Sequence, residues 1–401
     1  MAVADVNREA ARIDGQPLWQ SSVERIDIAV NGVHRRDRTE GVQHGLGADV
    51  SRMEDLGDPL ERLEHAVANE AVRIGDEADY DGPLMTRICD AHCHFLSSRF
   101  LELLTSSMTG LPEHGRAAAV SHRLGWDDPG GPDELADRWV SELDRSGVAR
   151  ATLIASIPGD DTSVATAVQR HPHRLIGFFM FNPMPDDAAS RLAAVLRGGH
   201  LRGVCLFPAM HGYRFDDQRV AEVFATAAHY GAVVFAHCGV LTVGVRKKLG
   251  LPSAFDPRLG DPLALAATAC RFPSVPVIVP HFGAGMFREA LMAADQCGNI
   301  LFDSSSSNGW MKYFPELTLE HVWRQALAVA GADRILFGTD SSFFPRGWQQ
   351  PVHAAQDAAL RAIGASASDR EKIFSGNFDR LFPDDGIVPH QRPEGSEPPT
   401  R

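Results

Sequence analysis

The chain has 401 residues, of which 44% are hydrophobic and 23% are charged, the balance of an ordinary globular protein. This composition excludes collagen-like, wholly disordered and disulfide-scaffold proteins. The net charge of −13 argues against nucleic-acid binding, which needs a basic surface. The longest apolar runs, such as residues 232–236, are far shorter than the ~20 residues of a membrane-spanning helix. We therefore expect neither nucleic acid nor a membrane as a partner.

The acidic charge is concentrated at the start of the chain. Residues 1–86 carry 18 acidic and 9 basic side chains, so the rest of the chain is close to neutral. Helical spacing is clear only at residues 59–74, and no strand pattern there could close a core. We expect an acidic N-terminal extension over residues 1–84 that is partly helical or disordered. It is either a dispensable segment before a native start near Met85, or a helical arm that packs on the next domain or on the second subunit of a homodimer.

The cysteines and the first residues bear on location. The chain begins without a basic segment followed by an apolar one, so we expect no secretory signal. Six cysteines fall mostly within apolar strand or helix patterns, which favours buried thiols over a disulfide framework. They are Cys89, Cys93, Cys205, Cys238, Cys270 and Cys297. A cytoplasmic protein is the interpretation.

From residue 87 onwards, short apolar runs rich in β-branched and aromatic residues alternate with helical patterns. The runs are almost continuously apolar, as in parallel strands that are covered on both faces. The expected strands are residues 87–95, 150–156, 175–181, 203–207, 232–237, 275–281, 299–304 and 334–340. The expected helices are residues 133–146, 163–170, 186–197, 217–230, 262–271, 285–296, 317–329 and 349–363.

Eight βα repeats in about 300 residues predict an α/β fold, a closed (β/α)₈ TIM barrel over residues 85–383. A doubly wound sheet is the alternative, but no glycine-rich fingerprint follows the first strand. Long loops at residues 96–131 and 239–261 lie after the first and fifth strands, where barrel loops cover an active site. A closing helix at residues 369–382 precedes a tail, residues 384–401, that should be disordered.

Histidines and one aspartate occur at the C-terminal ends of four expected strands, which is the active-site end of such a barrel. His92 and His94 are two residues apart on the first strand, so both side chains face the barrel lumen, while Cys93 points outward. The fifth, sixth and eighth strands end at His237, His281 and Asp340. Each residue alone is explained by a core hydrogen bond or a helix cap. Their coincidence at one end favours a metal site.

These motifs closely resemble the amidohydrolase superfamily, in particular its amidohydrolase-related branch, which includes enzymes like aminocarboxymuconate-semialdehyde decarboxylase. The resemblance covers about residues 87–383 and rests on an ordered set: Asp-Ala-His-Cys-His at 90–94, Ala-His-Cys-Gly at 236–239, Pro-His-Phe-Gly at 280–283 and Phe-Gly-Thr-Asp at 337–340. It implies a divalent metal ion, zinc first and manganese second. The implied ligands are His92, His94, His237 and Asp340, with His281 beside the activated water.

One departure from the superfamily predicts a single metal ion. Members with two ions use a carboxylated lysine at the end of the fourth strand, whereas residues 198–217 contain no lysine. Cys205 on that strand could be a soft ligand, but a buried thiol is the simpler interpretation.

The expected reaction is hydrolysis of a C–N or C–O bond by activated water. Asp340 would accept the proton of the water and pass it to the leaving group, while His281 orients the water or stabilises the oxyanion. Non-oxidative decarboxylation of an aromatic or enolic carboxylic acid in the same site is the alternative. A non-catalytic metal-binding barrel is the third hypothesis.

Loops at the expected mouth offer residues for a small-molecule substrate: His211, Arg214, Trp310 and Arg346. An arginine among aromatic side chains suits a flat, carboxylate-bearing molecule, because guanidinium pairs bidentately with carboxylate. The alternative for each residue is a solvated surface loop. Residues 304–307, a run of serines, are interpreted as a polar loop, and Asp303 could hold a ligating histidine in one tautomer.

Overall fold

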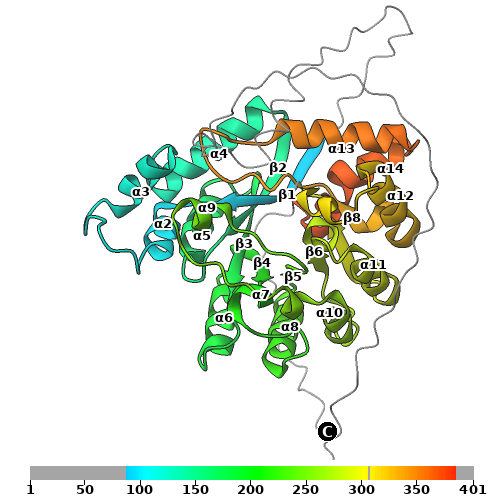
Figure 1. Ribbon diagram of the computed structural model, residues 1–401, viewed down its shortest axis with the longest axis horizontal. Coiled ribbons are helices and arrows are strands. Elements are labelled where there is room, and N and C mark those ends of the chain that lie inside the picture. The colour runs from blue at the N-terminus through cyan, green and yellow to red at the C-terminus, as the bar shows by residue number, and fades with distance from the viewer. Residues whose placement is uncertain (1–86, 306–307, 385–401) are drawn as a thin grey trace, which may run out of the picture. The chain divides into compact units, whose positions relative to one another are not determined.

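The computed structural model describes residues 87–305 and 308–384, whose centre is a sheet of eight parallel strands (Figure 1). Each strand pairs with the next one along the chain. The strands are β1 (Ile88–Phe95), β2 (Val148–Ala155), β3 (Leu175–Phe181), β4 (Leu201–Leu206), β5 (Val233–Ala236), β6 (Val277–Val279), β7 (Ile300–Asp303) and β8 (Ile335–Leu336). The predicted (β/α)₈ barrel is confirmed. The expected N-terminal extension and the tail after Asp384 lie outside the described residues.

Helices surround the strands, and the eight that the sequence predicted are all present (Figure 1). They are α4 (Pro132–Arg145), α5 (Asp161–Arg170), α6 (Ala188–Arg197), α8 (Gln218–Tyr230), α10 (Pro262–Ala269), α11 (Phe287–Gln296), α12 (Leu319–Ala330) and α13 (Gln350–Ala362). Asp217 caps α8 by accepting a hydrogen bond from the Arg219 N–H at 2.9 Å. No helix in the described part of the chain has the length and apolarity to cross a membrane.

Side chains of the central strand β3 alternate between two cores. On β3, Ile176, Phe178 and Met180 belong to the core inside the barrel. Phe179 and Phe181 belong to the larger core between the strands and the helices. Both faces of β3 are therefore apolar, which explains why its sequence is a continuous apolar run rather than an alternating one.

The barrel closes between β1 and the residues that follow β8. The Ala91 N–H donates to the Phe337 carbonyl at 2.8 Å, and the His94 N–H donates to the Ser341 carbonyl at 2.7 Å. The Asp340 N–H donates to the His92 carbonyl at 2.9 Å. The expected strand 334–340 is wrong in its length, because the regular strand ends at Leu336 and Asp340 has a left-handed backbone, with φ of 59°.

The two long loops that follow β1 and β5 pack on one another. The first contains α2 (Ser98–Leu104) and α3 (Arg116–Leu124), which the sequence did not predict, and the second contains α9 (Gly244–Lys248). Leu101, Val120 and Leu249 share a small core of their own. The two loops therefore form one structure at the C-terminal end of the strands.

The expected closing helix is present in three parts: α14 (Ala367–Glu371), a π-helical turn (Lys372–Gly376) and α15 (Asn377–Leu381). Phe378 and Phe382 enter the core inside the barrel. The buried Arg150 of β2 donates to the Phe382 carbonyl at 2.5 Å and to Asp379 at 3.0 Å. These contacts close the N-terminal end of the barrel.

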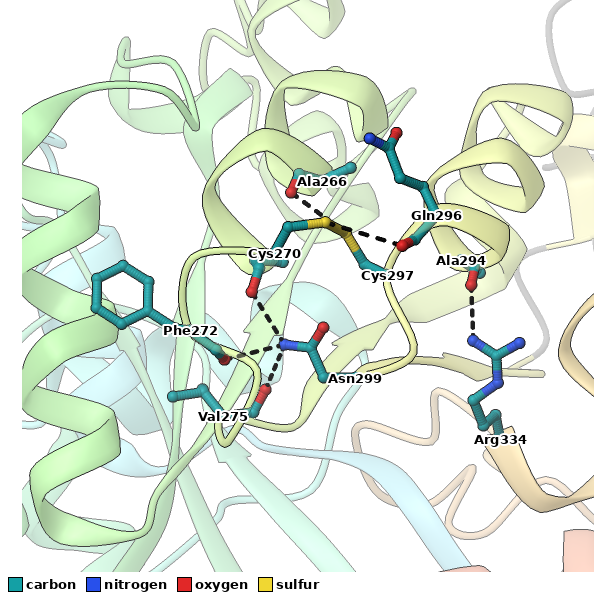
Figure 2. The surroundings of a disulfide bond; sticks show 10 residues. Ala266, Cys270, Phe272, Val275, Ala294, Gln296, Cys297, Asn299 and Arg334 are labelled. Carbon is teal, nitrogen blue, oxygen red and sulfur yellow. Dashed lines mark hydrogen bonds between the residues drawn. A yellow bond between two sulfur atoms is a disulfide. The ribbon is translucent and has the colours of Figure 1, made fainter.

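A disulfide joins Cys270 and Cys297, which corrects the prediction that the cysteines are thiols (Figure 2). Cys270 follows α10 and Cys297 follows α11, and these neighbouring helices bring the two Cα atoms to 5.5 Å, within bonding range. The other four cysteines are free and buried. The pairing depends on how two helices end side by side, which the separation of 27 residues along the chain does not reveal.

Removing this disulfide should lower the stability of the barrel. Because the bond closes a loop of 27 residues, its loss in a Cys270→Ser/Cys297→Ser variant should cost about 3.5 kcal/mol through the entropy of the unfolded chain. Urea unfolding of wild type and variant, each with and without dithiothreitol, measures this effect. Reductant should destabilise only the wild-type protein, and a double variant as stable as the oxidised wild type would contradict the prediction.

A buried carboxyl group before α5 should make stability depend on pH. Asp160 accepts hydrogen bonds from the hydroxyls of Ser97 at 2.8 Å and Ser163 at 2.6 Å, yet burial raises its pKa to about 6. Since the unfolded pKa is about 3.9, the neutral carboxyl stabilises the fold fully below about pH 4, and this contribution is lost as the pH rises through about 6. The loss amounts to roughly 3 kcal/mol.

Melting temperatures of wild type and Asp160→Asn, measured from pH 4 to pH 7, test this dependence. The stability of wild type should fall relative to that of the variant across this window, because asparagine does not ionise. Parallel curves would show that Asp160 titrates at the same pH in the folded and unfolded chains.

Candidate metal centre and catalytic site

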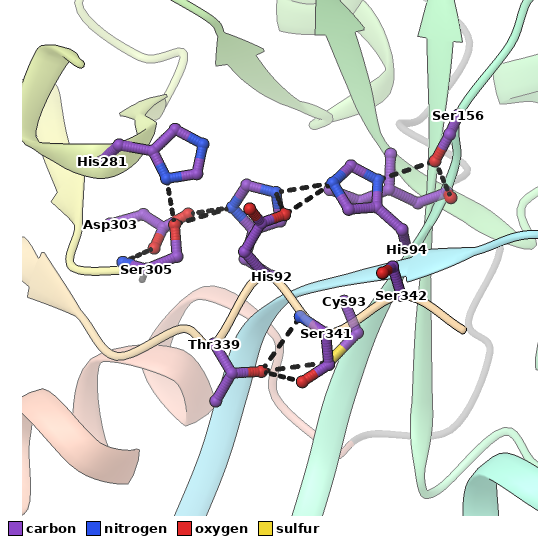
Figure 3. Close-up of polar contacts among 12 residues, drawn as sticks. His92, Cys93, His94, Ser156, His281, Asp303, Ser305, Thr339, Ser341 and Ser342 are labelled. Atoms are coloured by element: carbon purple, nitrogen blue, oxygen red, sulfur yellow. Dashed lines mark hydrogen bonds and ion pairs between the residues drawn. The ribbon is translucent and has the colours of Figure 1, made fainter. Parts of the chain in front are cut away.

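Two histidines of β1 share one face of the strand and point into the mouth of the barrel (Figure 3). The Nε2 atoms of His92 and His94 lie 3.3 Å apart. Cys93, between them, is buried in the outer core beneath the helices. The predicted alternation of these three side chains is confirmed.

Asp340 comes to this pair from the seam that closes the barrel. Its Oδ1 atom lies 2.9 Å from the Nε2 atom of His94 and 3.6 Å from that of His92. These three residues offer ligand atoms that all lie within 4.8 Å of one another. The left-handed backbone of Asp340 costs about 1–3 kcal/mol, a strain typical of functional sites.

His281 lies beside this group. The sequence predicted that His281 ends a strand, but the structure places it after the strand. The strand β6 ends at Val279, and His281 follows in a left-handed conformation with φ of 55°. Its ring centroid lies 5.0 Å from that of His92. The expected strand 275–281 is therefore two residues too long at this end, because an extended strand cannot contain that backbone angle.

His237 follows β5 and completes the ring of polar side chains. Its ring stacks on Phe207 at 5.2 Å and lies 5.5 Å from the ring of His281. Among the described residues, the group within mutual ligand distance contains His92, His94 and Asp340 but not His237. The structure brings all five predicted side chains together, and the role of His237 as a ligand stays a prediction.

A buried carboxylate fastens β1 to the segment that carries Asp340. Oδ1 of Asp90 accepts from the backbone N–H groups of His92 at 2.8 Å and Thr339 at 3.2 Å. Oδ2 accepts from the Thr339 hydroxyl at 2.6 Å and from the Trp348 indole at 2.7 Å. Burial raises the pKa of Asp90 to about 6 even though these four donors stabilise its anion. Asp90 thus sets the position of the site.

The hydrogen bonds of the β1 histidines leave both Nε2 atoms suited to a cation. His92 donates through Nδ1 to Oδ2 of Asp303 at 2.6 Å. The Ser156 hydroxyl donates to the Ile154 carbonyl at 3.0 Å, so it accepts from Nδ1 of His94 at 2.7 Å. In the neutral rings the Nε2 atoms then carry lone pairs, and these face a carboxylate oxygen. Three acceptors without a donor fit a metal ion, and His, His and Asp are ligands of zinc and manganese.

A glycine allows this close packing. A Cβ on Gly338 would lie 2.6 Å from Oδ1 of Asp303 and 2.9 Å from the Cβ of His92. The Phe-Gly-Thr-Asp motif therefore needs glycine at its second position so that Asp303 can reach His92.

Burial and neighbouring charges set the protonation of the site. Burial favours the neutral form of Asp340, but the adjacent imidazole groups of His94 and His92 hold its pKa well below the usual range. Burial lowers the pKa of His237 and of His281, and neighbouring histidines add to this effect. Asp340 is therefore ionised at neutral pH, and the rings of His237 and His281 are neutral.

The four expected substrate-binding residues have different surroundings. His211 is half-buried after β4, where burial lowers its pKa to about 4, and its Nδ1 atom is buried without a hydrogen bond in the described chain. Trp310 is buried and packs on Phe287. The other two are exposed: Arg214 pairs with Asp216 at 2.9 Å, and Arg346 donates to the Ser342 hydroxyl at 3.0 Å. Their binding roles stay predictions.

Two serines of the site were missed. Ser156 contacts His94, and Ser305 lies in the run interpreted as a polar loop. Ser305 is fully buried, and its hydroxyl lies 2.7 Å from Nδ1 of His281. Ser304 and Ser305 lie in a loop after β7, but both side chains are buried rather than solvated. The only signal for Ser156 and Ser305 in the sequence was that they follow the strands β2 and β7.

A (β/α)₈ barrel that gathers histidines and an aspartate at the ends of its strands has the architecture of a metal-dependent barrel enzyme. A family model described as amidohydrolase matches residues 89–383. The chain belongs to the amidohydrolase family, as the motifs indicated. No protein with a curated description matches the chain.

Solved structures share the fold at low sequence identity. An uncharacterized TIM-barrel protein from Bordetella bronchiseptica has a TM-score of 0.52 and 18% identity, covering 74% of this chain and 99% of that one. A 5-carboxyvanillate decarboxylase from Novosphingobium aromaticivorans, complexed with manganese and a nitrobenzoic acid, has a TM-score of 0.50 and 15% identity, covering 74% and 96%. This likeness supports the barrel fold.

Proposed function

We propose that this protein is a metal-dependent hydrolase that cleaves a C–N or C–O bond of a small molecule. The observation that carries the proposal is the carboxylate of Asp340, whose Oδ1 atom lies 2.9 Å from Nε2 of His94 and whose pKa neighbouring histidines hold well below the usual range. Its side chain is 29% exposed, so it can meet both water and substrate. A carboxylate in this place can accept a proton from attacking water and return it to the leaving group.

His92, His94 and Asp340 would hold the metal ion, with His237 as a further ligand. A divalent ion bound there supplies Lewis-acid activation of water or of a substrate oxygen. His237 suits the added role because its ring is neutral and its Nδ1 atom is buried without a hydrogen-bond partner among the described residues. Zinc is the first candidate, and manganese is the second.

Decarboxylation of an aromatic or enolic acid in the same site is the second candidate function. It is favoured by the 5-carboxyvanillate decarboxylase that shares the barrel and was solved with manganese. In this reaction the residues of the site would hold the carboxylate and protonate a carbon atom in place of attack by water. Arg346, exposed after β8, is the proposed partner for a substrate carboxylate.

Isotopes from the solvent separate the two functions. The zinc-loaded and manganese-loaded proteins would be incubated with amides, lactones and aromatic acids in water enriched in oxygen-18 or deuterium, and the products analysed by mass spectrometry. Hydrolysis places solvent oxygen in the acid product, whereas decarboxylation releases CO₂ and places solvent deuterium on carbon. Release of CO₂ together with an organic product that contains no solvent oxygen would overturn the hydrolase proposal.

Location and assembly are further proposals. The cytoplasmic location predicted from the cysteines is weakened by the Cys270–Cys297 disulfide, because such bonds are rare in the cytosol. A homodimer, with residues 1–84 as an arm on the second subunit, is tested by comparing the full chain with a chain that begins at Met85 in light scattering. If the dimer depends on this arm, the full chain has the mass of a dimer and the chain that begins at Met85 has the mass of a monomer.

A further inference from the structure

Ser305 lies between two histidines of the site, and its hydroxyl proton can serve only one of them. Its Oγ atom is 3.0 Å from Nδ1 of His92 and 2.7 Å from Nδ1 of His281 (Figure 3). Ser305 is fully buried, so water cannot satisfy its hydroxyl. A buried donor without an acceptor costs about 1–3 kcal/mol, and the O–H group should therefore point at one of these two nitrogens.

Nδ1 of His92 cannot accept the hydroxyl hydrogen of Ser305. Nδ1 of His92 lies 2.6 Å from Oδ2 of Asp303, and a carboxylate can only accept, so this nitrogen carries a hydrogen. A nitrogen that carries a hydrogen cannot accept a second one from Ser305. The acceptor that remains among the described residues is Nδ1 of His281.

The His281 side is free to accept. The imidazole is 5% exposed, and in the described chain no carboxylate lies within ion-pair distance of its nitrogens, so nothing there requires a charged ring. If Ser305 donates to Nδ1, the single hydrogen of the neutral ring is on Nε2. Nε2 is on the edge of the ring that faces away from Ser305.

The position of Ser305 is itself held by the protein. Its N–H donates to Oδ1 of Asp303 at 2.7 Å. The carbonyl of Ser304 accepts from the Gln356 side chain at 2.7 Å, and Gln356 in turn accepts from the Trp323 indole at 2.7 Å. Helices α12 and α13 thus hold the end of β7 and, with Asp303, fix the place of Ser305.

We propose that Ser305 is a positioning residue that holds His281 in the tautomer with its hydrogen on Nε2. His92 and His94 then offer lone pairs to the site, and His281 offers a hydrogen-bond donor. The next step rests on the proposed function. The Nε2–H group of His281 would donate a hydrogen bond to a substrate oxygen that gains negative charge, such as that of an amide, ester or carboxylate group. The substrate class is therefore one with an acceptor oxygen next to the bond that breaks.

Nuclear magnetic resonance of the full chain labelled with nitrogen-15 histidine, stripped of metal, tests the tautomer without any turnover. Long-range proton–nitrogen correlations distinguish the two neutral tautomers, and the His281→Gln variant identifies the His281 signal. Wild type should show hydrogen on Nε2 of His281. Hydrogen on Nδ1 in the wild-type protein would overturn the proposal, whatever any variant does.

Two neighbouring variants form a matched pair. Ser305→Ala removes the donor and should shift His281 towards the other tautomer or a mixture. Ser304→Ala is the control, because the Ser304 hydroxyl is equally buried and has no hydrogen-bond partner among the described residues. An unchanged His281 tautomer in folded Ser305→Ala would also overturn the proposal.

A metal measurement separates positioning from general damage. Asp303→Asn should weaken metal binding about 10- to 100-fold because it frees His92, while Ser305→Ala should weaken it less than about threefold. On a substrate found in the isotope assay, Ser305→Ala should lower kcat about 10- to 100-fold with little change in KM. Metal loss in Ser305→Ala equal to that in Asp303→Asn would assign Ser305 to His92 instead. If no substrate reacts, the proposed function is wrong. The tautomer of His281 is still decided by the magnetic resonance measurement, which needs no turnover.

Discussion

Asp340→Asn should lower turnover about a thousandfold, because a neutral amide cannot accept the proton of the attacking water. The variant keeps the size of the side chain and an oxygen atom that can face His94. In the wild-type protein Oδ1 of Asp340 lies 2.9 Å from Nε2 of His94. We therefore expect a folded protein with reduced metal affinity and almost no activity. Steady-state kinetics on a substrate from the isotope assay and titration with zinc measure both effects.

The matched control is Asp216→Asn. Asp216 is an exposed carboxylate in the loop after β4, where it pairs with Arg214. Its substitution should leave turnover within about twofold of wild type, since an exposed ion pair contributes little. Turnover of Asp340→Asn within tenfold of wild type would remove Asp340 from the catalytic role and favour a ligand role alone.

Asp90→Asn should weaken the junction that positions the site and lower the stability of the barrel. The carboxylate accepts four hydrogen bonds in the protein interior, from His92, Thr339 (twice) and Trp348. An amide turns one accepting oxygen into a donor, so two buried donors lose their acceptor at about 1–3 kcal/mol each. Removal of the buried charge offsets part of this loss, since burial raises the pKa of Asp90 to about 6. Because Asp90 joins β1 to the segment that holds Asp340, zinc affinity should fall as well.

Thermal melts at pH 8, where Asp90 is ionised, measure this effect. Asp186→Asn is the control, because Asp186 is an exposed carboxylate before α6. A melting temperature for Asp90→Asn within about 3 °C of wild type, equivalent to roughly 1 kcal/mol, would show that the amide finds new partners and that Asp90 is not the fastening point.

Local patterns predicted the parts of this protein that depend on local chemistry. The bounds predicted for β3, residues 175–181, match because an uninterrupted apolar run is enough to define a strand covered on both faces. The common orientation of His92 and His94 followed from the period of two along a strand. The placement of Asp340 and His281 at the same end followed from the parallel order of the strands.

Features that depend on distant contacts were missed or wrong. The early end of β8 and the left-handed backbone of Asp340 occur where this segment bonds to β1, and they leave no mark in the Gly-Thr-Asp sequence. Ser305 meets His92 across 213 residues, so a search for a neighbouring base along the chain could not find it. The Cys270–Cys297 bond similarly reflects how α10 and α11 end side by side.

The seam between β1 and the residues after β8 also sets when the protein can become functional during synthesis. His94 leaves the ribosome early and Asp340 leaves it 246 residues later, yet their side chains meet in one site. Contacts between such distant residues form late in folding. Until the ribosome has made the segment 337–341, β1 presents an open edge that invites pairing with other chains. The same few hydrogen bonds that complete the site therefore end the period in which a nascent chain is most exposed to aggregation.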